Sequence, residues 1–133
     1  MASDPLLQDK PFSFVRVAPR PIKPRPYGLT LIADRGWGMN RVDDVLEMAG
    51  DYVDWVKMGI GAFRLQDEEF LLRKIAAFKK RDVKIFFAGD VTEAALLQGV
   101  SKEFYAEVKR LGADGVEVSS AQVSMSLDDK CNL

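Results

Sequence analysis

The sequence has no histidine and only one cysteine, Cys131, among its 133 residues. The usual zinc-ligand spacings and every histidine-based catalytic triad are therefore excluded. Cys131 has no second cysteine with which to form an internal disulfide. Any acid or base chemistry must come from Asp, Glu, Lys or Tyr side chains.

Long apolar runs and a strong net charge are also missing. No segment approaches the roughly 18 to 20 consecutive apolar residues of a membrane-spanning helix, and the first residues, MASDPLLQDKPFSF, do not resemble a secretory signal. With 19 basic and 20 acidic residues and no basic block, the chain lacks the clustered cations that nucleic-acid binding requires. We therefore expect a soluble, cytoplasmic, single-domain protein with no membrane or nucleic-acid partner.

Proline and glycine divide the chain into two parts. All six prolines lie at or before Pro26, and all ten glycines lie at or after Gly28. Closely spaced prolines are incompatible with a helix or a central strand, so we predict an extended arm over residues 1–26 and a domain over residues 27–133. Arg16, Arg20, Lys23 and Arg25 make this arm locally basic. We interpret the arm as a strap across the domain, and an anion-binding lid is the alternative.

Four short apolar segments follow the arm, each separated from the next by an amphipathic stretch. They occupy residues 29–33, 52–57, 83–87 and 115–118. This alternation is typical of parallel βα units. Since a closed (β/α)₈ barrel needs eight units and ~250 residues, we predict an α/β fold with about four TIM-barrel-type units, a half barrel. A doubly wound domain of flavodoxin type is the structural alternative.

Unpaired edges of a four-stranded parallel sheet have a consequence for assembly. Parallel sheets are normally covered on both faces, and free strand edges promote pairing with another chain. The pattern therefore predicts either a truncated barrel or a homo-oligomer.

Helix boundaries and core aromatic residues can also be predicted. We expect N-caps at Asn40, Asp67, Ser101 and Ser126, the last with Asp129 in a capping box. Gly112 is placed to follow the end of a helix with positive φ. Tyr52, Trp55, Phe86 and Phe87 are assigned to the hydrophobic core.

Polar residues at the ends of the predicted strands are the candidates for chemistry, because parallel α/β folds bind ligands there. The four charged residues in these positions are Asp34, Lys57, Asp90 and Glu117. Two or three carboxylates around a lysine suit Mg²⁺ and an anionic substrate. Each charge taken singly has an equal alternative as a helix cap or a pairing partner, and for Asp90 the cap is favoured.

Two glycines follow the second strand, in the pattern Gly59-x-Gly61. Their backbone amides could approach a phosphate, but the third glycine of the dinucleotide-binding fingerprint is missing. A tight turn that requires positive φ is the favoured interpretation.

Three segments resemble the phosphosulfolactate synthase family: KPRPYGLTLIADRG (23–36), AGDYVDWVKMGIG (49–61) and LGADGVEVS (111–119). The resemblance runs from about Lys23 to Lys130, the first half of a family member. It implies a TIM-barrel lyase that adds sulfite to phosphoenolpyruvate with Mg²⁺, on the route to coenzyme M. The implied roles are catalysis for Lys57 and Glu117, metal binding for Asp34 and Glu117, and substrate binding for Arg35, Gly59, Gly61 and Ser119.

The sequence departs from the synthase pattern at three places. Ala62 stands where the synthases have Thr or Ser, residues 88–90 (Ala-Gly-Asp) replace Gly-Gly-Thr, and residues 120–121 (Ser-Ala) replace Asp-Gly. The Gly-Asp pair is similar to the plant heat-stress-associated relatives of the family. Two functions therefore stay open: a Mg²⁺-dependent synthase, or a non-catalytic half-barrel module that acts through self-association or a partner.

Overall fold

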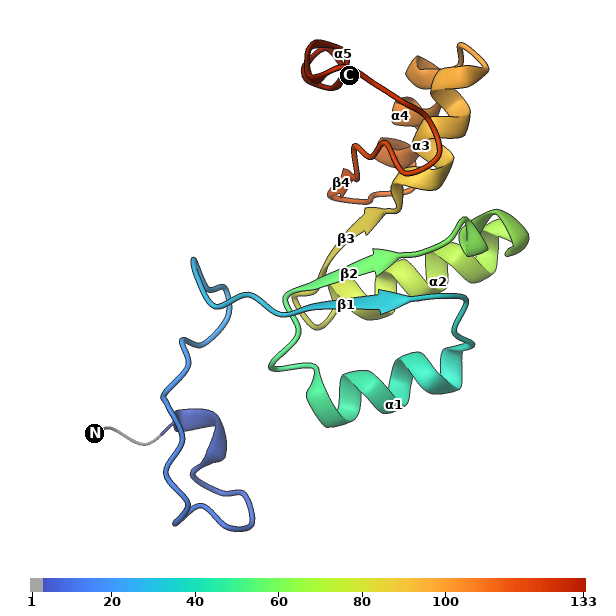
Figure 1. Ribbon diagram of the computed structural model, residues 1–133. Helices are drawn as coiled ribbons and strands as arrows, with labels where there is room; N and C mark the ends of the chain where they lie inside the picture. Colours follow the sequence, from blue (N-terminus) through green and yellow to red (C-terminus); the bar gives the residue numbers. More distant parts are fainter. Residues whose placement is uncertain (1–3) are drawn as a thin grey trace.

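The computed structural model describes residues 4–133 and contains one parallel sheet of four strands (Figure 1). The strands are β1 (Leu31–Asp34), β2 (Trp55–Met58), β3 (Lys84–Phe87) and β4 (Gly115–Val116). Each strand pairs in parallel with the next one along the chain, in the order β1-β2-β3-β4. This sequential order confirms the half-barrel prediction and is incompatible with the flavodoxin alternative, whose strand order is permuted.

Helical segments connect the strands and follow the last one. They are α1 (Met39–Ala49), the 3₁₀ turn η2 (Ala62–Leu65), α2 (Glu68–Lys79), α3 (Gly89–Leu97), α4 (Ser101–Arg110) and α5 (Leu127–Cys131), and the 3₁₀ turn η1 (Pro5–Leu7) lies in the arm. In the described part of the chain, no helix is long and apolar enough to cross a membrane.

The helix ends test the predicted caps. The capping box of Ser126 and Asp129 is confirmed, and Gly112 follows α4 with φ +80° as expected. The caps predicted at Asn40 and Ser101 are wrong, because α1 begins one residue earlier, after Gly38, and α4 begins after Val100. Asp67 occupies the N-cap position of α2 but makes no side-chain bond to the helix.

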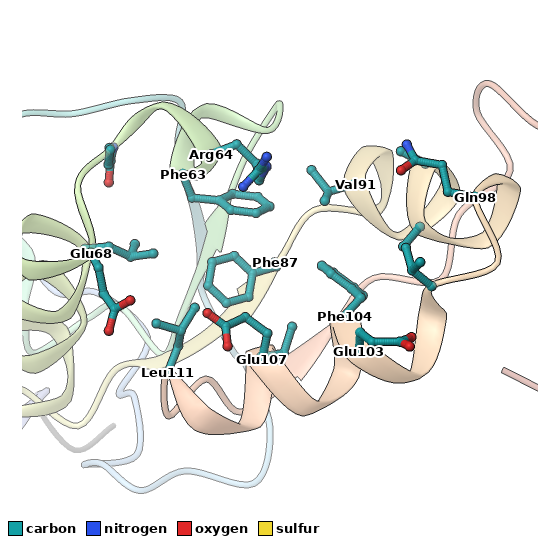
Figure 2. Close-up of a pocket in the computed structure, with 16 residues that line it drawn as sticks. Phe63, Arg64, Glu68, Phe87, Val91, Gln98, Glu103, Phe104, Glu107 and Leu111 are labelled. Atoms are coloured by element: carbon teal, nitrogen blue, oxygen red, sulfur yellow. The ribbon is translucent and has the colours of Figure 1, made fainter.

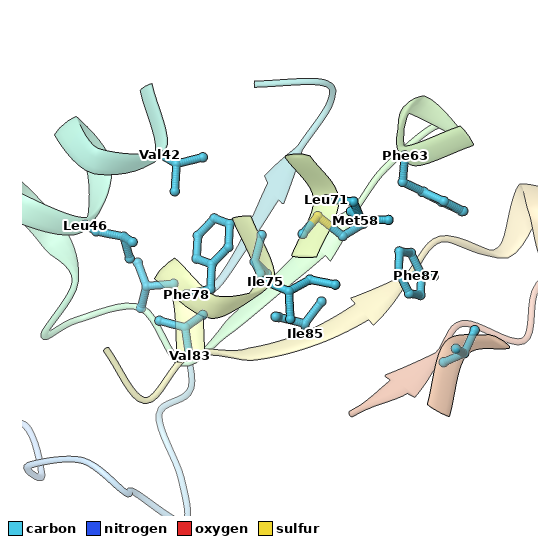
Figure 3. Close-up of a cluster of buried hydrophobic side chains, with 13 residues drawn as sticks. Val42, Leu46, Met58, Phe63, Leu71, Ile75, Phe78, Val83, Ile85 and Phe87 are labelled. Atoms are coloured by element: carbon cyan, nitrogen blue, oxygen red, sulfur yellow. The ribbon is translucent and has the colours of Figure 1, made fainter. Parts of the chain in front are cut away.

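The hydrophobic core lies between one face of the sheet and the helices (Figure 3). The strand register places Val56 beside Ile85, and both are fully buried. Leu46 of α1, Phe78 of α2 and Val108 of α4 pack in the same cluster. Full burial of each such side chain contributes ~1.5–3 kcal/mol, so this covered face is the main source of stability.

The opposite face of the sheet carries a different set of side chains. Trp55 and Phe86 lie there in an edge-to-face pair with ring centroids 6.0 Å apart, and both are partly exposed. Their assignment to the core was therefore wrong, whereas Phe87, one residue further along β3, is buried in the core as predicted. Leu31 is 54% exposed on this second face, which in a closed (β/α)₈ barrel points toward the interior.

The arm lies across the amino-terminal ends of the strands. Arg25 is buried, and its Nε lies 2.9 Å from Oδ1 of Asp54, while Arg20 reaches Oδ2 of the same carboxylate at 3.2 Å. Lys23 donates to the backbone oxygens of Gly50 and Arg81 at 2.7 and 2.9 Å. These basic side chains are thus used at the end of the sheet opposite the carboxyl ends of the strands, which is the geometry of a strap. The domain boundary near residue 27 stays a prediction.

Replacing Arg25 by Ala should lower the free energy of unfolding by about 3 kcal/mol, because it leaves the buried Asp54 carboxylate without its closest cation. Urea unfolding followed by circular dichroism measures this loss. Arg16→Ala is the matched control, since Arg16 is an exposed cation of the same arm and should change stability by less than about 0.5 kcal/mol. Equal effects of the two substitutions would contradict the strap role of Arg25.

Candidate functional site

A cavity of about 450 Å³ lies at the carboxyl ends of the strands. We call it the rim cavity, and its lining residues are Ala33, Arg35, Lys57, Gly59, Ile60, Ala88, Asp90, Glu117, Ser119, Ala121 and Gln122. The volume falls within the ~300–1,000 Å³ range of small-molecule sites. Five residues with a role implied by the family resemblance therefore line one cavity, namely Arg35, Lys57, Gly59, Glu117 and Ser119, and the strand-end candidate Asp90 lines it too.

Lys57 and Glu117 form an ion pair in this cavity. Nζ of Lys57 lies 2.9 and 2.8 Å from the two carboxylate oxygens of Glu117, and Oε2 also accepts a hydrogen bond from the Gly89 amide at 2.8 Å. The Lys57 hydrogen bond holds the pKa of Glu117 below its ordinary value; burial opposes this shift and the Gly89 amide supports it. Glu117 is thus a carboxylate at neutral pH. Both side chains are about one-third exposed, so a ligand can reach the pair.

Asp34 lies on the other face of the sheet, away from this pair. Its Oδ2 accepts from Nζ of Lys74 in α2 at 2.8 Å, and its Oδ1 accepts from the amides of Gly36 and Trp37 at 2.7 and 2.6 Å. The reason is the strand register: Ala33 pairs with Lys57, whereas Asp34 pairs with Met58. Successive residues of a strand point to opposite faces of the sheet. Asp34 and Lys57 both lie near the carboxyl ends of their strands, but their side chains point to opposite faces and therefore do not meet.

This placement bears on the predicted Mg²⁺ site. Asp34 and Glu117 are on opposite faces, and the Asp34 oxygens are already used by a buried lysine and two amides. The two residues therefore do not fit a metal ion held by both. Within residues 4–133, no group of three or more Asp, Glu or Cys residues is arranged to hold a metal. Glu117 is left as a carboxylate that faces the rim cavity, and Mg²⁺ itself stays a prediction.

The loop after β2 forms one wall of the cavity and contains two left-handed residues. Gly61 has φ +63°, as the tight-turn interpretation predicts, and Ile60 has φ +50°. A β-branched residue at positive φ is strained, and such strain concentrates at functional sites. Ile60 is 67% exposed, so little packing compensates the strain. Gly61 does not line the cavity but lies beside it, next to Asp90.

Asp90 is the second residue of α3 and lines the cavity. The prediction that it caps this helix is wrong, because the N-cap is Ala88 and no side-chain cap bond is present there. In the described residues, its buried Oδ1 has no hydrogen-bond partner. An acidic side chain in the first turn of a helix stabilises the helix through its dipole, and Asp90 has this position in α3.

Glu93 is a site residue that the sequence analysis missed. Its carboxylate is 1% exposed and accepts four hydrogen bonds from the loop after β4. The donors are the Ser119 hydroxyl and the amides of Ala121, Gln122 and Val123, the amides at 2.8, 2.7 and 2.8 Å. The signal was an acidic residue inside the apolar helix VTEAALL, which indicates a buried carboxylate with partners elsewhere. Ser119, predicted to bind substrate, thus donates its hydroxyl to Glu93.

These contacts change the titration of Glu93. The hydrogen bond from Ser119 has the largest effect; burial opposes it, and the three amides add to it, so that the pKa of Glu93 falls to about 2. The carboxylate is therefore charged at any pH at which the loop is in place.

A second cavity of about 450 Å³ lies on the helix side of the sheet, between η2 and α2 on one side and α3 and α4 on the other (Figure 2). Phe63, Phe87 and Phe104 point into it, and acidic side chains such as Glu68 and Glu107 surround it. Arg110 bridges these two glutamates at 2.9 and 2.6 Å. None of the site residues predicted from the sequence lines this cavity. We place the candidate site at the rim, where cationic and anionic groups converge on one space.

Comparisons with known proteins relate the chain to one family. Residues 18–133 match the family model described as (2R)-phospho-3-sulfolactate synthase. The chain is 32% identical to the phosphosulfolactate synthase of Methanothermobacter thermautotrophicus over 86% of its own length and 45% of the relative's, and 34% identical to that of Methanocaldococcus jannaschii over 79% and 42%. It is also 30% identical to the protein heat-stress-associated 32 of Arabidopsis thaliana, over 81% and 39%. The chain spans less than half the length of these relatives.

Ile60→Asn should raise the free energy of unfolding by about 1 kcal/mol, because asparagine tolerates the left-handed conformation that isoleucine adopts only with strain. Urea unfolding measures the gain. Ile22→Asn is the control: Ile22 is similarly exposed, at 62%, and has no positive φ. A loss of stability in Ile60→Asn would show that the isoleucine side chain contributes more than its backbone strain costs.

The shifted pKa of Glu93 predicts a pH dependence of stability. Its folded pKa of about 2 lies below the ordinary value of 4.5, so its contribution is fully present above pH 4.5 and is lost as the pH falls toward 2. The wild-type chain should therefore lose its stability advantage over Glu93→Gln between pH 4.5 and 2, as urea midpoints at several pH values will show. The exposed Glu47→Gln variant should follow the wild type. A constant difference between wild type and Glu93→Gln from pH 7 to 3 would refute the shift.

Proposed function

The chain belongs to the (2R)-phospho-3-sulfolactate synthase family, and from that premise we propose that its rim cavity binds phosphoenolpyruvate for the addition of sulfite. The observation that carries the proposal is the Lys57–Glu117 pair, which opens onto the rim cavity beside Arg35. Because the chain spans less than half of its relatives, we assign these residues to part of a site.

The charges of the cavity suit an anionic substrate. Phosphoenolpyruvate carries a phosphate and a carboxylate, and sulfite is a second anion, so cations must offset their mutual repulsion. Lys57 and Arg35 supply two positive charges, and Glu117 holds the Lys57 ammonium in place through both carboxylate oxygens. Oriented charges of this kind stabilise a transition state more than mobile water does.

The reaction requires no protein nucleophile. Sulfite provides the electron pair for the new carbon–sulfur bond at the methylene carbon of phosphoenolpyruvate. The carbon–carbon π bond opens, negative charge develops at C2 and the substrate carboxylate, and C2 then takes up a proton from solvent. We assign Lys57 to the stabilisation of that charge and Glu117 to the orientation of Lys57. Gly59 borders the same space, and its lack of a side chain would let the phosphate approach the backbone closely. The Gly59 amide itself donates to the Asp34 backbone oxygen at 2.7 Å.

Magnesium enters the proposal with Glu117 as its protein ligand. Mg²⁺ commonly binds through one or two carboxylates together with substrate phosphate oxygens, and a single rim carboxylate satisfies that pattern. Its chemistry would be to neutralise charge on the phosphate and the carboxylate of the substrate. Asp34 takes no part, because the strand register places it on the face of the sheet opposite the rim cavity. We further propose a cytoplasmic location, the expectation drawn from the sequence.

A second candidate function is a non-catalytic half barrel that associates with another copy of the chain. The partly exposed face with Leu31, Trp55 and Phe86, and the free edges of β1 and β4, favour it. A two-fold axis along the barrel direction would pair each β4 with the β1 of the other copy in parallel. The relative named for heat stress is consistent with a role other than synthesis.

Millimolar phosphoenolpyruvate with Mg²⁺ should raise the melting temperature of the chain, since ligand that binds only the folded state stabilises it by about 2.7 kcal/mol at 100 times its Kd. Lys57→Met should abolish the shift. Lys84→Met is the control, because Lys84 is exposed on the same face but lies at the start of β3, where its ammonium stacks on Trp55.

An unshifted wild-type melting temperature would contradict substrate binding by this chain. Light scattering on a sizing column then tests the second candidate, which requires a particle of twice the 14.9 kDa chain mass.

A further inference from the structure

The segment that follows β4 is held mainly from outside the sheet. β4 has only two residues, Gly115 and Val116, and the last ladder bond beyond it runs from the Glu117 amide to the Phe87 oxygen at 2.9 Å. Past that point the backbone runs as a loop through Ser119 to Val123. The rim cavity is nevertheless lined by Glu117 and by this loop, so their positions must be fixed by other contacts.

The first turns of α3 provide those contacts at two points. The Gly89 amide donates to Oε2 of Glu117 at 2.8 Å. One turn later, the Glu93 carboxylate accepts the four hydrogen bonds from residues 119–123. The absence of a side chain at Gly89 also lets the loop after β4 approach the helix closely. A Cβ at Gly89 would lie 2.6 Å from Cβ of Ser119 and 3.2 Å from the backbone oxygen of Glu117. The helix thus holds the Glu117 side chain and the loop that follows Glu117.

We propose that Glu93 is a positioning residue of the rim cavity, which fixes the loop after β4 and thereby holds Glu117 where it meets Lys57. The inference rests on the proposed function, because the rim cavity is the site that is positioned. It adds a residue that lines no part of the cavity itself.

The chemistry of the contact requires a carboxylate. All four partners are donors, and a carboxylate is an acceptor at both oxygens. Glutamine would turn one end into an NH₂ group that faces backbone N–H groups, so two of the four hydrogen bonds would be lost. Hydrogen bonds to a charged group contribute about 1.5–3 kcal/mol each. Burial of the charge is compensated by this full set of donors, with no cation among them.

Structural support alone and positioning of Glu117 make different predictions for the Gly89 amide, which donates to Oε2 of Glu117 at 2.8 Å. Gly89 is the first residue of α3, so its amide has no acceptor within the helix. If Glu93→Gln only weakens the loop after β4, the hydrogen bond of the Gly89 amide is kept. If the substitution also releases Glu117, this hydrogen bond weakens and the Gly89 amide exchanges faster with solvent.

The experiment is amide hydrogen exchange followed by NMR in the 133-residue chain. Glu93→Gln should speed exchange by about tenfold or more at residues 121–123 and also at Gly89, relative to amides in the middle of α1 that report overall stability. Gly89→Ala, which displaces Ser119 without changing any charge, should speed exchange at position 89 and at residues 121–123 in the same way. Glu47→Gln, an exposed change on α1, should leave both readouts unchanged.

Unchanged exchange of the Gly89 amide in a folded Glu93→Gln chain overturns the inference, even if its stability falls. If that variant does not fold, Gly89→Ala decides by the same criterion. Neither readout uses a substrate. A wild-type chain that does not respond to phosphoenolpyruvate would therefore count against the proposed function, while the exchange measurement would still decide the role of Glu93.

Discussion

Successive side chains of a β-strand point to opposite faces of the sheet, and this alternation sorts the charged residues at the strand ends. Asp34 and Lys57 each stand near the end of their strand, but the register pairs Asp34 with Met58 and Ala33 with Lys57. One charge therefore enters the core with the helices and the other enters the rim cavity. The hydrophobic row of Val56 and Ile85 obeys the same rule, so core and site are two results of one constraint.

The charge that enters the core must be compensated there. Asp34 and Lys74 are almost fully buried and lie 2.8 Å apart. Breaking such a pair by removing one member costs ~3–5 kcal/mol, because the other charge stays buried alone. The pair also acts locally, since the second oxygen of Asp34 orders the amides of Gly36 and Trp37. Arg35 lies between Asp34 and Gly36 in this ordered turn and lines the rim cavity. The Asp34 contacts that order the turn are made on the other face of the sheet.

Features with local causes were predictable from the sequence, and those with distant causes were not. Strand periodicity, the capping box at Ser126 and the positive φ of Gly61 depend on a few neighbouring residues. The partner of Asp34 is 40 residues away in the chain, and the partners of Glu93 are 26 to 30 residues away. The four-unit fold could be predicted, and so could five residues of one cavity. The division of charges between faces required the register, which short apolar runs do not define.

The open face of the sheet and the open side of the rim cavity would both be covered by the remaining strands of a closed barrel. In a closed barrel the face with Trp55 and Phe86 would meet side chains from other strands, and the rim would be completed by the loops that follow those strands. A chain that closes the sheet therefore also completes the site. A ligand that contacts this chain and the chain that closes the barrel couples two equilibria. It must raise the affinity of the two chains for each other by the same factor by which their association raises the affinity for the ligand. For any such ligand, binding and barrel closure would be two measures of one free energy of coupling.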